Sequence, residues 1–294
     1  MIKNKKILVL GGDSRQTFLA KRLKDKGHDV YCYGFNLTEN SELNKISNLN
    51  EIKKQINVLV LPIISSNDDK TVNAPFFDGE ITLNDAIETL KPHSIVVGGN
   101  LSKNLRTLFF EHGHFSVDYY IREELKIKNC IPTAEGALSI AIDEMPVTIA
   151  GSRILIIGFG RVGEACAKLF KSLESDVFIC ARRLDSFAWA ELYGYKSIET
   201  DDIDCYLSEF DLIINTVPAK ILDKKKLSKI DKNTLVIDLA SKPGGVDFDN
   251  ARQLGLKTIW ALSLPGKVAP VTSGKIIADT ILNILDERGD EPWQ

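Results

Sequence analysis

The chain has 294 residues, 44% of them hydrophobic and 26% charged, with a formal net charge of −3. This length allows two ordinary domains with cores of their own, and the balanced charge gives no reason to expect nucleic acid or a membrane surface as partner. Five scattered cysteines without Cys-x-x-Cys spacing favour reduced thiols over a disulfide framework or a metal site. With no signal peptide and no apolar run of membrane-spanning length, we expect a cytoplasmic protein.

The first half of the chain predicts an α/β unit, in which short apolar runs alternate with an amphipathic helix that ends near Lys26. The polar stretch 65–82 is predicted to be a long loop, of the kind that is usually functional or mobile. Buried strands are predicted at residues 6–10, 29–33, 57–63 and 94–99.

The turn after the first strand, Gly11-Gly12-Asp13-Ser14-Arg15, lacks the spacing of a nucleotide-binding loop. Asp13 precedes a predicted helix, where an acidic cap is common, and capping explains it as well as a ligand does. Arg15 places a cation against the helix dipole. An anionic ligand at that helix end would offset the conflict, so Arg15 is a candidate substrate contact.

The second half of the chain predicts another α/β unit behind a connecting helix. This helix is expected to begin at Pro132 and to end before Met145. A last helix at residues 273–287, capped by Thr272 or Ser273, follows the Pro/Gly-rich segment 264–270. Strands are predicted at residues 153–157, 176–181, 212–216, 235–239 and 257–260.

The alternation of strands and helices predicts an α/β fold with two Rossmann-like, doubly wound parallel sheets and a cleft between them. The C-terminal helix is expected to pack back on the first domain. The predicted segments are an N-terminal substrate or partner domain at 1–131, a connecting helix at 132–146, an NADP-binding domain at 147–266, and a C-terminal loop and helix at 267–294.

The most informative motif is a glycine-rich turn between a buried strand and a helix. Gly158 permits the tight turn, Gly160 lets the backbone approach a pyrophosphate, and Gly163 lets the helix pack close to the strand. The alternative is a packing turn in a domain that binds no nucleotide. The predicted cofactor-binding residues of this turn are Gly158, Phe159, Gly160, Arg161, Val162 and Gly163.

The next strand ends in Arg182 and Arg183. An NAD-binding domain usually has Asp or Glu here to hold the ribose 2′-hydroxyl group, whereas arginine favours a 2′-phosphate. The predicted cofactor is therefore NADP.

Two further strands end in polar turns at the edge of the sheet where ligands bind. Thr216, Val217 and Pro218 are expected to border the nicotinamide or its ribose, although an Asx turn closed by proline explains the same residues. Ser241 and Lys242 are expected to face the same crevice, where Lys242 is either a carboxylate contact or a solvated loop residue.

The positions of the histidines argue against two functions, 2-hydroxy-acid dehydrogenation and metal binding. All four histidines precede residue 115, which disfavours 2-hydroxy-acid dehydrogenation because its acid–base histidine belongs to the cofactor half. His112-Gly113-His114 is predicted to end a helix rather than to bind metal. Neither Tyr119 nor Tyr120 has a lysine four residues on, as methylenetetrahydrofolate dehydrogenases require.

Taken together, several segments resemble the A subunits of dipicolinate synthases. These segments are GGDSRQ (11–16), IPTAEG (131–136), the GFGRVG turn with its trailing arginines, NTVP (215–218), DLASKPGGVDF (238–248) and LPGKVAP (264–270). The resemblance implies oxidation of a dihydrodipicolinate-type cyclic imine to the aromatic pyridine, with NADP⁺ as hydride acceptor. It also implies the flavoprotein-like B subunit of dipicolinate synthase as partner in a homo- or hetero-oligomer, and action in the mother cell during sporulation.

Such a substrate is a small dicarboxylate dianion, which calls for cations or N–H donors. The candidate substrate-binding residues are Arg15, Ser241, Lys242 and, through their backbone N–H groups, Gly244 and Gly245. Arg15 and Lys242 are also candidate catalytic residues, together with Glu135. Glu135 is the candidate proton acceptor, although a glutamate at a helix N-terminus needs no ligand. Two alternatives stay open: a non-catalytic NADP-binding protein with a regulatory or scaffold role, and a shikimate- or methylenetetrahydrofolate-type dehydrogenase of similar architecture.

Overall fold

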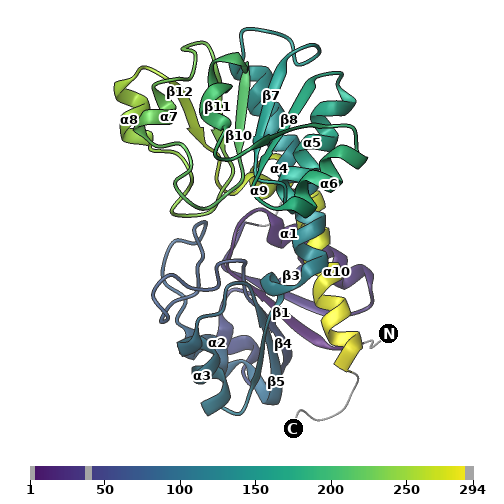
Figure 1. The fold of residues 1–294 in the computed structure, drawn as a ribbon. Coiled ribbons are helices and arrows are strands. Elements are labelled where there is room, and N and C mark those ends of the chain that lie inside the picture. The colour runs from purple at the N-terminus through teal and green to yellow at the C-terminus, as the bar shows by residue number, and fades with distance from the viewer. Residues whose placement is uncertain (1–3, 37–41, 289–294) are drawn as a thin grey trace. The chain divides into compact units, whose positions relative to one another are not determined.

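The computed structural model describes residues 4–36 and 42–288, which form two compact units (Figure 1). Unit 1 combines the N-terminal part up to Asn129 with the C-terminal part from Ala269, and unit 2 is Cys130–Val268. Residues 1–3 and 289–294, at the outer ends of the predicted segments 1–131 and 267–294, lie outside the described residues, as do residues 37–41.

Each unit is built on a six-stranded parallel sheet, and the two sheets have the same strand order. The order is β3-β2-β1-β4-β5-β6 in unit 1 and β9-β8-β7-β10-β11-β12 in unit 2. Two doubly wound parallel sheets are therefore confirmed. In each sheet the order in which the strands are connected reverses beside the first strand, between β1 and β4 in unit 1 and between β7 and β10 in unit 2. The strands are β1 Lys6–Leu10, β2 Asp29–Tyr33, β3 Asn44–Lys45, β4 Ile56–Val60, β5 Leu90–Gly98, β6 Phe115–Asp118, β7 Arg153–Ile157, β8 Asp176–Ala181, β9 Lys196–Glu199, β10 Leu212–Asn215, β11 Leu235–Asp238 and β12 Lys257–Trp260.

Alternate residues of the central strand separate the two faces of the sheet in unit 1. Ile7 and Val9 pack with α1 (Arg15–Asp25) and α10 (Pro270–Arg288). Leu8 and Leu10 face the other way, toward the short helix η1 (Leu49–Ile52), α2 (Leu83–Glu88) and α3 (Lys103–Glu111). Because both faces are covered, the central strands β1 and β4 are mostly apolar.

Unit 2 repeats this arrangement around β7. Ile154 and Ile156 pack with α4 (Glu123–Glu144), α5 (Arg161–Ser172) and α6 (Leu184–Leu192). Leu155 and Ile157 lie in the core on the opposite face. That face is covered by η3 (Ile203–Cys205), η4 (Leu207–Glu209), α7 (Lys224–Leu227) and α8 (Phe248–Gln253).

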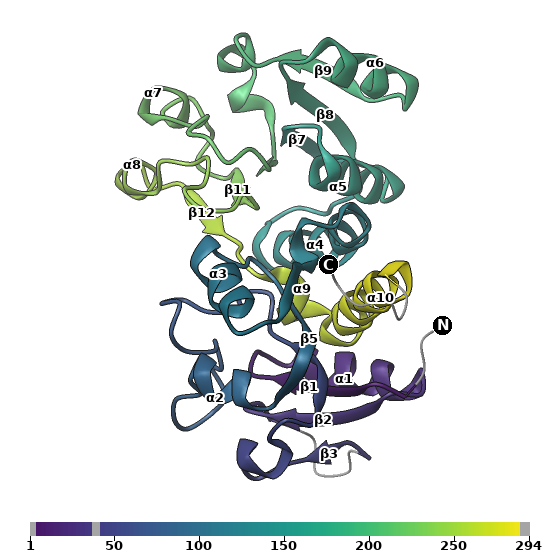
Figure 2. The ribbon, with the colours of Figure 1, turned by 90° about the horizontal axis from the view of Figure 1, so that it is seen from below.

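The C-terminal helix α10 packs on unit 1, as predicted, and lies beside α1 (Figure 2). A Cβ atom on Gly274 would lie 2.4 Å from the Arg15 carbonyl oxygen, so the two backbones approach closely. The predicted cap at Thr272 or Ser273 is wrong, because α10 already begins at Pro270, a residue well suited to the first helical turn. The segment before it is also helical, as α9 (Leu264–Val268).

The connecting helix is longer than predicted. It begins at Glu123 rather than Pro132, so the proline lies inside α4. Proline removes a backbone hydrogen bond there, which is why the sequence predicts a helix start. Packing outweighs this cost, since Leu125 is buried before the proline and Ala134 and Ala141 are buried after it.

The polar segment 65–82 covers the turn that follows β1. The Gly12 N–H donates to the Asn73 carbonyl at 2.8 Å, and a Cβ on Gly11 would lie 2.7 Å from a Val72 methyl group. The turn after β1 is thus in contact with a segment of the chain itself on the side of Val72 and Asn73.

Candidate functional site

The glycine-rich turn of unit 2 has the backbone geometry that phosphate binding needs. Gly158 has a φ of +93°, which suits glycine. A Cβ on Gly163 would lie 2.1 Å from the Gly158 carbonyl oxygen, so helix α5 packs against the turn only because this residue is glycine. A Cβ on Gly160 would meet no atom within 4 Å. Gly160, at the N-terminus of α5, therefore borders open space in which an anion has room.

The other predicted residues of the turn have different surroundings. The Phe159 ring is buried and meets Tyr195 edge-on at 5.9 Å, which leaves only its backbone for a cofactor. Arg161 is exposed at the first position of α5, and Val162 is half-buried. A cofactor can therefore reach the Arg161 side chain but not that of Phe159.

The turn after β10 lies directly against the glycine turn. A Cβ on Gly158 would lie 2.5 Å from Thr216 Oγ1 and 2.7 Å from a Val217 methyl group. The Thr216 hydroxyl donates to the Ile157 carbonyl at 3.0 Å. The Asx turn is confirmed, because Asn215 Oδ1 accepts from the Val217 N–H at 3.2 Å. The structure thus brings the predicted residues Thr216 and Val217 to the glycine turn, with Pro218 exposed behind them.

A buried pair at two strand ends holds the polar turns in place. The strand register sets Asn215 beside Asp238, and Asn215 Nδ2 donates to Asp238 Oδ1 at 2.8 Å. The same carboxylate accepts the N–H groups of Ala240 at 3.0 Å and Gly245 at 2.7 Å. The sequence analysis missed this pair. The signal was a polar residue at the end of each of two neighbouring apolar strands.

These contacts correct the prediction for Gly244 and Gly245. The Gly244 N–H donates to the Ser241 carbonyl at 2.8 Å, and the Gly245 N–H donates to Asp238. Both groups are used inside the loop, so the two glycines shape it and offer no donors to a ligand. Ser241 and Lys242 are exposed at its tip. The Lys242 ammonium group pairs with no residue that the structure describes.

The two arginines after β8 differ in whether their side chains are ion-paired. Arg183 is ion-paired with Asp185, and their hydrogen bond raises the pKa of Arg183 and lowers that of Asp185. Arg182 is also exposed, but it has no ion pair or hydrogen-bond partner for its side chain within the described part of the chain. Of the two arginines, Arg182 is therefore the one whose charge is not paired within the described residues.

Two other candidate residues, Arg15 and Glu135, have surroundings that differ from those the sequence predicts. Arg15 forms a two-point ion pair with Asp13, with Nε–Oδ1 at 2.8 Å and Nη2–Oδ2 at 2.5 Å. Burial raises the pKa of Asp13, but hydrogen bonds and the charge of Arg15 outweigh it and leave that pKa lowered. The anion that Arg15 requires is thus supplied by the chain. Glu135 is exposed in the middle of α4, not at a helix N-terminus as predicted.

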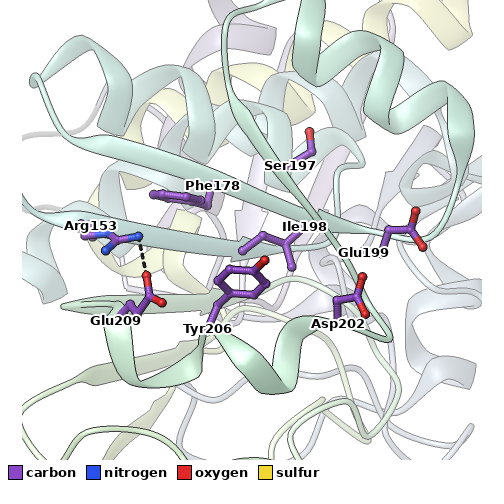
Figure 3. A pocket seen from close by; sticks show the side chains of 8 residues that line it. All are labelled: Arg153, Phe178, Ser197, Ile198, Glu199, Asp202, Tyr206 and Glu209. Atoms are coloured by element: carbon purple, nitrogen blue, oxygen red, sulfur yellow. Dashed lines mark ion pairs between the residues drawn. The ribbon is translucent and has the colours of Figure 1, made fainter.

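A cavity of about 270 Å³ in unit 2 does not belong to this site (Figure 3). Its lining shares no residue with the glycine turn or with the turns after β10 and β11. Arg153 pairs there with Glu209 at 2.8 Å and lies over the Phe178 ring. With Glu199 and Asp202 as well, carboxylates outnumber the one arginine, so the lining would repel a dicarboxylate.

No helix among the described residues is both long and apolar enough to span a membrane. Within residues 4–36 and 42–288, no group of three or more His, Cys, Asp and Glu side chains is arranged to hold a metal ion.

A doubly wound parallel sheet with this turn between β7 and α5 defines the class of protein: it has a dehydrogenase-type domain that binds a nicotinamide dinucleotide. Residues 134–244 match the family model "D-isomer specific 2-hydroxyacid dehydrogenase, NAD binding domain", and residues 6–120 match the family model for the N-terminal domain of the dipicolinate synthase A subunit. Over 290 residues, the chain is 32% identical to the A subunit of dipicolinate synthase from Bacillus subtilis, with 98% of each chain covered. The chain belongs to the family of dipicolinate synthase A subunits.

Two solved structures have the same fold over nearly their whole length. The A subunit of dipicolinate synthase from Bacillus halodurans superposes with a TM-score of 0.88 at 31% identity, covering 97% of this chain and 98% of that one. The A chain of the Bacillus subtilis synthase gives a TM-score of 0.87 at 32% identity, covering 98% and 97%.

Proposed function

We propose that this protein oxidises dihydrodipicolinate to dipicolinate with NADP⁺ as the hydride acceptor, together with the B subunit of the enzyme and during sporulation. Membership of the family of dipicolinate synthase A subunits supports the substrate. The observation that carries the redox role is the open space at Gly160, in a turn that Thr216 contacts at Gly158. The reaction removes one hydride, which passes to the nicotinamide, and one proton, and it leaves an aromatic ring.

The choice of NADP⁺ rests on Arg182. Its exposed guanidinium group follows β8, where the ribose of the cofactor lies in domains of this kind. A 2′-phosphate supplies the negative partner that the Arg182 guanidinium group lacks among the described residues, whereas a free 2′-hydroxyl group carries no charge.

Lys242 and Ser241 are the proposed contacts for a substrate carboxylate. Both are exposed on the loop after β11, and the Asn215–Asp238 pair holds this loop beside the Thr216 turn. Glu135 remains the proposed proton acceptor, as an exposed carboxylate without a partner among the described residues. Since aromatisation drives the reaction, orientation of the substrate matters more than a strong base.

The test supplies the purified chain, alone and with the B subunit, with NADP⁺ and the product of dihydrodipicolinate synthase. We expect NADPH by absorbance and dipicolinate by mass spectrometry in equal amounts. No NADPH with both proteins present would refute the proposed activity. Cofactor binding without turnover would identify a non-catalytic NADP-binding protein instead. NADPH formation with shikimate or with methylenetetrahydrofolate, and not with dihydrodipicolinate, would identify a dehydrogenase of the corresponding type.

A further inference from the structure

Gln16, in the first turn of α1, has a side-chain amide without a hydrogen-bond partner among the residues that the structure describes. The residue is 2% exposed, and its Nε2 atom is buried with no hydrogen-bond partner among the described residues. Oε1 also accepts no hydrogen bond from these residues, but unlike Nε2 it is not completely buried. Native proteins rarely leave a buried amide unpaired, so we expect a group beyond the described residues, such as a bound ligand, to complete it.

This amide lies where a doubly wound sheet binds its ligand. A Cβ on Gly12, in the turn after β1, would lie 2.6 Å from Gln16 Cγ and 2.9 Å from Pro62 Cβ. Pro62 follows β4, the neighbour of β1 on the side where the strand order reverses (Figure 1). Gln16 is therefore at the topological switch point of unit 1, outside the carboxyl ends of its strands.

Other polar groups of this turn are already engaged. The Gly11 N–H donates to Tyr33 O at 2.9 Å, the Gly12 N–H donates to Asn73 O, and the Arg15 guanidinium group is held by Asp13. The Gln16 amide differs from them, because its NH₂ group has no acceptor among the described residues. A 180° rotation about its terminal torsion exchanges the two amide atoms, so that the NH₂ group takes the less enclosed side and Oε1 takes the buried position.

We propose that Gln16 is a substrate-binding residue, whose side-chain NH₂ group donates a hydrogen bond to a carboxylate oxygen of the dicarboxylate. This inference rests on the proposed function. A neutral amide binds a carboxylate there without adding a buried charge beside the Asp13–Arg15 pair. Gln16 thus takes the role of substrate contact that the sequence assigned to Arg15.

The experiment compares Gln16→Met, which keeps the length and removes the amide, with Gln16→Glu, which replaces it by an anion. With NADP⁺ saturating, we expect KM for dihydrodipicolinate to rise about 10- to 100-fold in Gln16→Met, the worth of one hydrogen bond to a charged group, and further in Gln16→Glu. The dissociation constant for NADP⁺ should stay within about twofold, and Gln16→Met should melt no lower than the wild type because an unpaired buried donor is gone. The control is Gln253→Met, the same change at an exposed position of α8, which should leave KM unchanged.

A KM within about twofold of wild type in folded Gln16→Met and Gln16→Glu would overturn the inference while leaving the proposed function standing. A second measurement needs neither turnover nor a functional variant. In wild-type protein labelled with ¹⁵N-glutamine, dipicolinate should shift the side-chain NH₂ signal of Gln16, identified by its absence in Gln16→Met. If dipicolinate binds by calorimetry without moving that signal, Gln16 does not contact it.

Discussion

At the scale of single residues, partners within the chain decide which charges are available to a ligand. Arg182 and Arg183 are adjacent and both exposed, yet only Arg183 has a carboxylate partner among the described residues, Asp185. Arg15 and Asp13 form a similar two-point pair in unit 1. A cation that the chain already neutralises contributes little to binding an anion from solution.

The cofactor proposal therefore makes different predictions for the two arginines. Arg182→Ala should weaken NADP⁺ binding about 10- to 100-fold and leave NAD⁺ binding unchanged, since only the 2′-phosphate contact is lost. Arg183→Ala should change either constant less than about threefold. Titration calorimetry with both cofactors measures this, and equal losses in the two variants would contradict the assignment.

At the scale of elements, the β7–α5 turn contains two glycines with different predicted roles: Gly160 in cofactor binding and Gly163 in folding. Gly160→Ala adds a methyl group in open space at a φ of −102°, which alanine adopts without strain. We expect a free energy of unfolding within about 1 kcal/mol of wild type, and an affinity for the dinucleotide at least about tenfold lower, because the methyl group occupies the space of the phosphate.

Gly163→Ala is the matched comparison. Its Cβ would lie 2.1 Å from the Gly158 carbonyl oxygen, a backbone atom, so the helix must move. We expect a loss of about 1–3 kcal/mol in the free energy of unfolding, measured by urea denaturation. A Gly160→Ala variant that binds NADP⁺ as tightly as wild type would show that the pyrophosphate does not lie at this turn.

At the scale of the whole molecule, the last helix completes the core of the first unit. Ile277, Ile281 and Leu285 of α10 are buried together with β1 and α1. Ile281→Ala should lower the free energy of unfolding of unit 1 by about 2–5 kcal/mol. Amide hydrogen exchange should become faster in unit 1 and stay unchanged in the β7–α5 region of unit 2. The control is Asn283→Ala, on the exposed side of α10, which should leave exchange unchanged in both units.

Unit 1 should also lose stability in mild acid. His28 and His114 are buried, and burial lowers the pKa of each below its ordinary value of 6.5. The unfolded chain therefore binds protons at higher pH than the folded one, and stability falls as the pH drops through 6.5 until the folded-state pKa values are passed. Melting curves from about pH 8 to pH 5 should show this decline, and His28→Gln should reduce it. An unchanged decline in that variant would assign the effect elsewhere.

Much of the fold around the candidate cofactor site could be predicted from local sequence. Alternation, apolar runs and glycine spacing are short-range signals, so the strands, the turn at Gly158 and the arginines after β8 were recognisable. Helix ends were less predictable where packing competes with local preference. Pro132 lies inside α4 because buried residues on both sides hold the helix together.

The sequence by itself determined the two doubly wound sheets, the dinucleotide turn and the family, because each is carried by residues close together in the chain. Only the tertiary structure decided which polar groups are free. It paired Asn215 with Asp238 across 23 residues, used the Gly245 N–H inside its loop, and left the Gln16 amide without a partner among the described residues. The physical reason is that a hydrogen bond depends on strand register and on the approach of distant segments, which no local pattern of residues encodes.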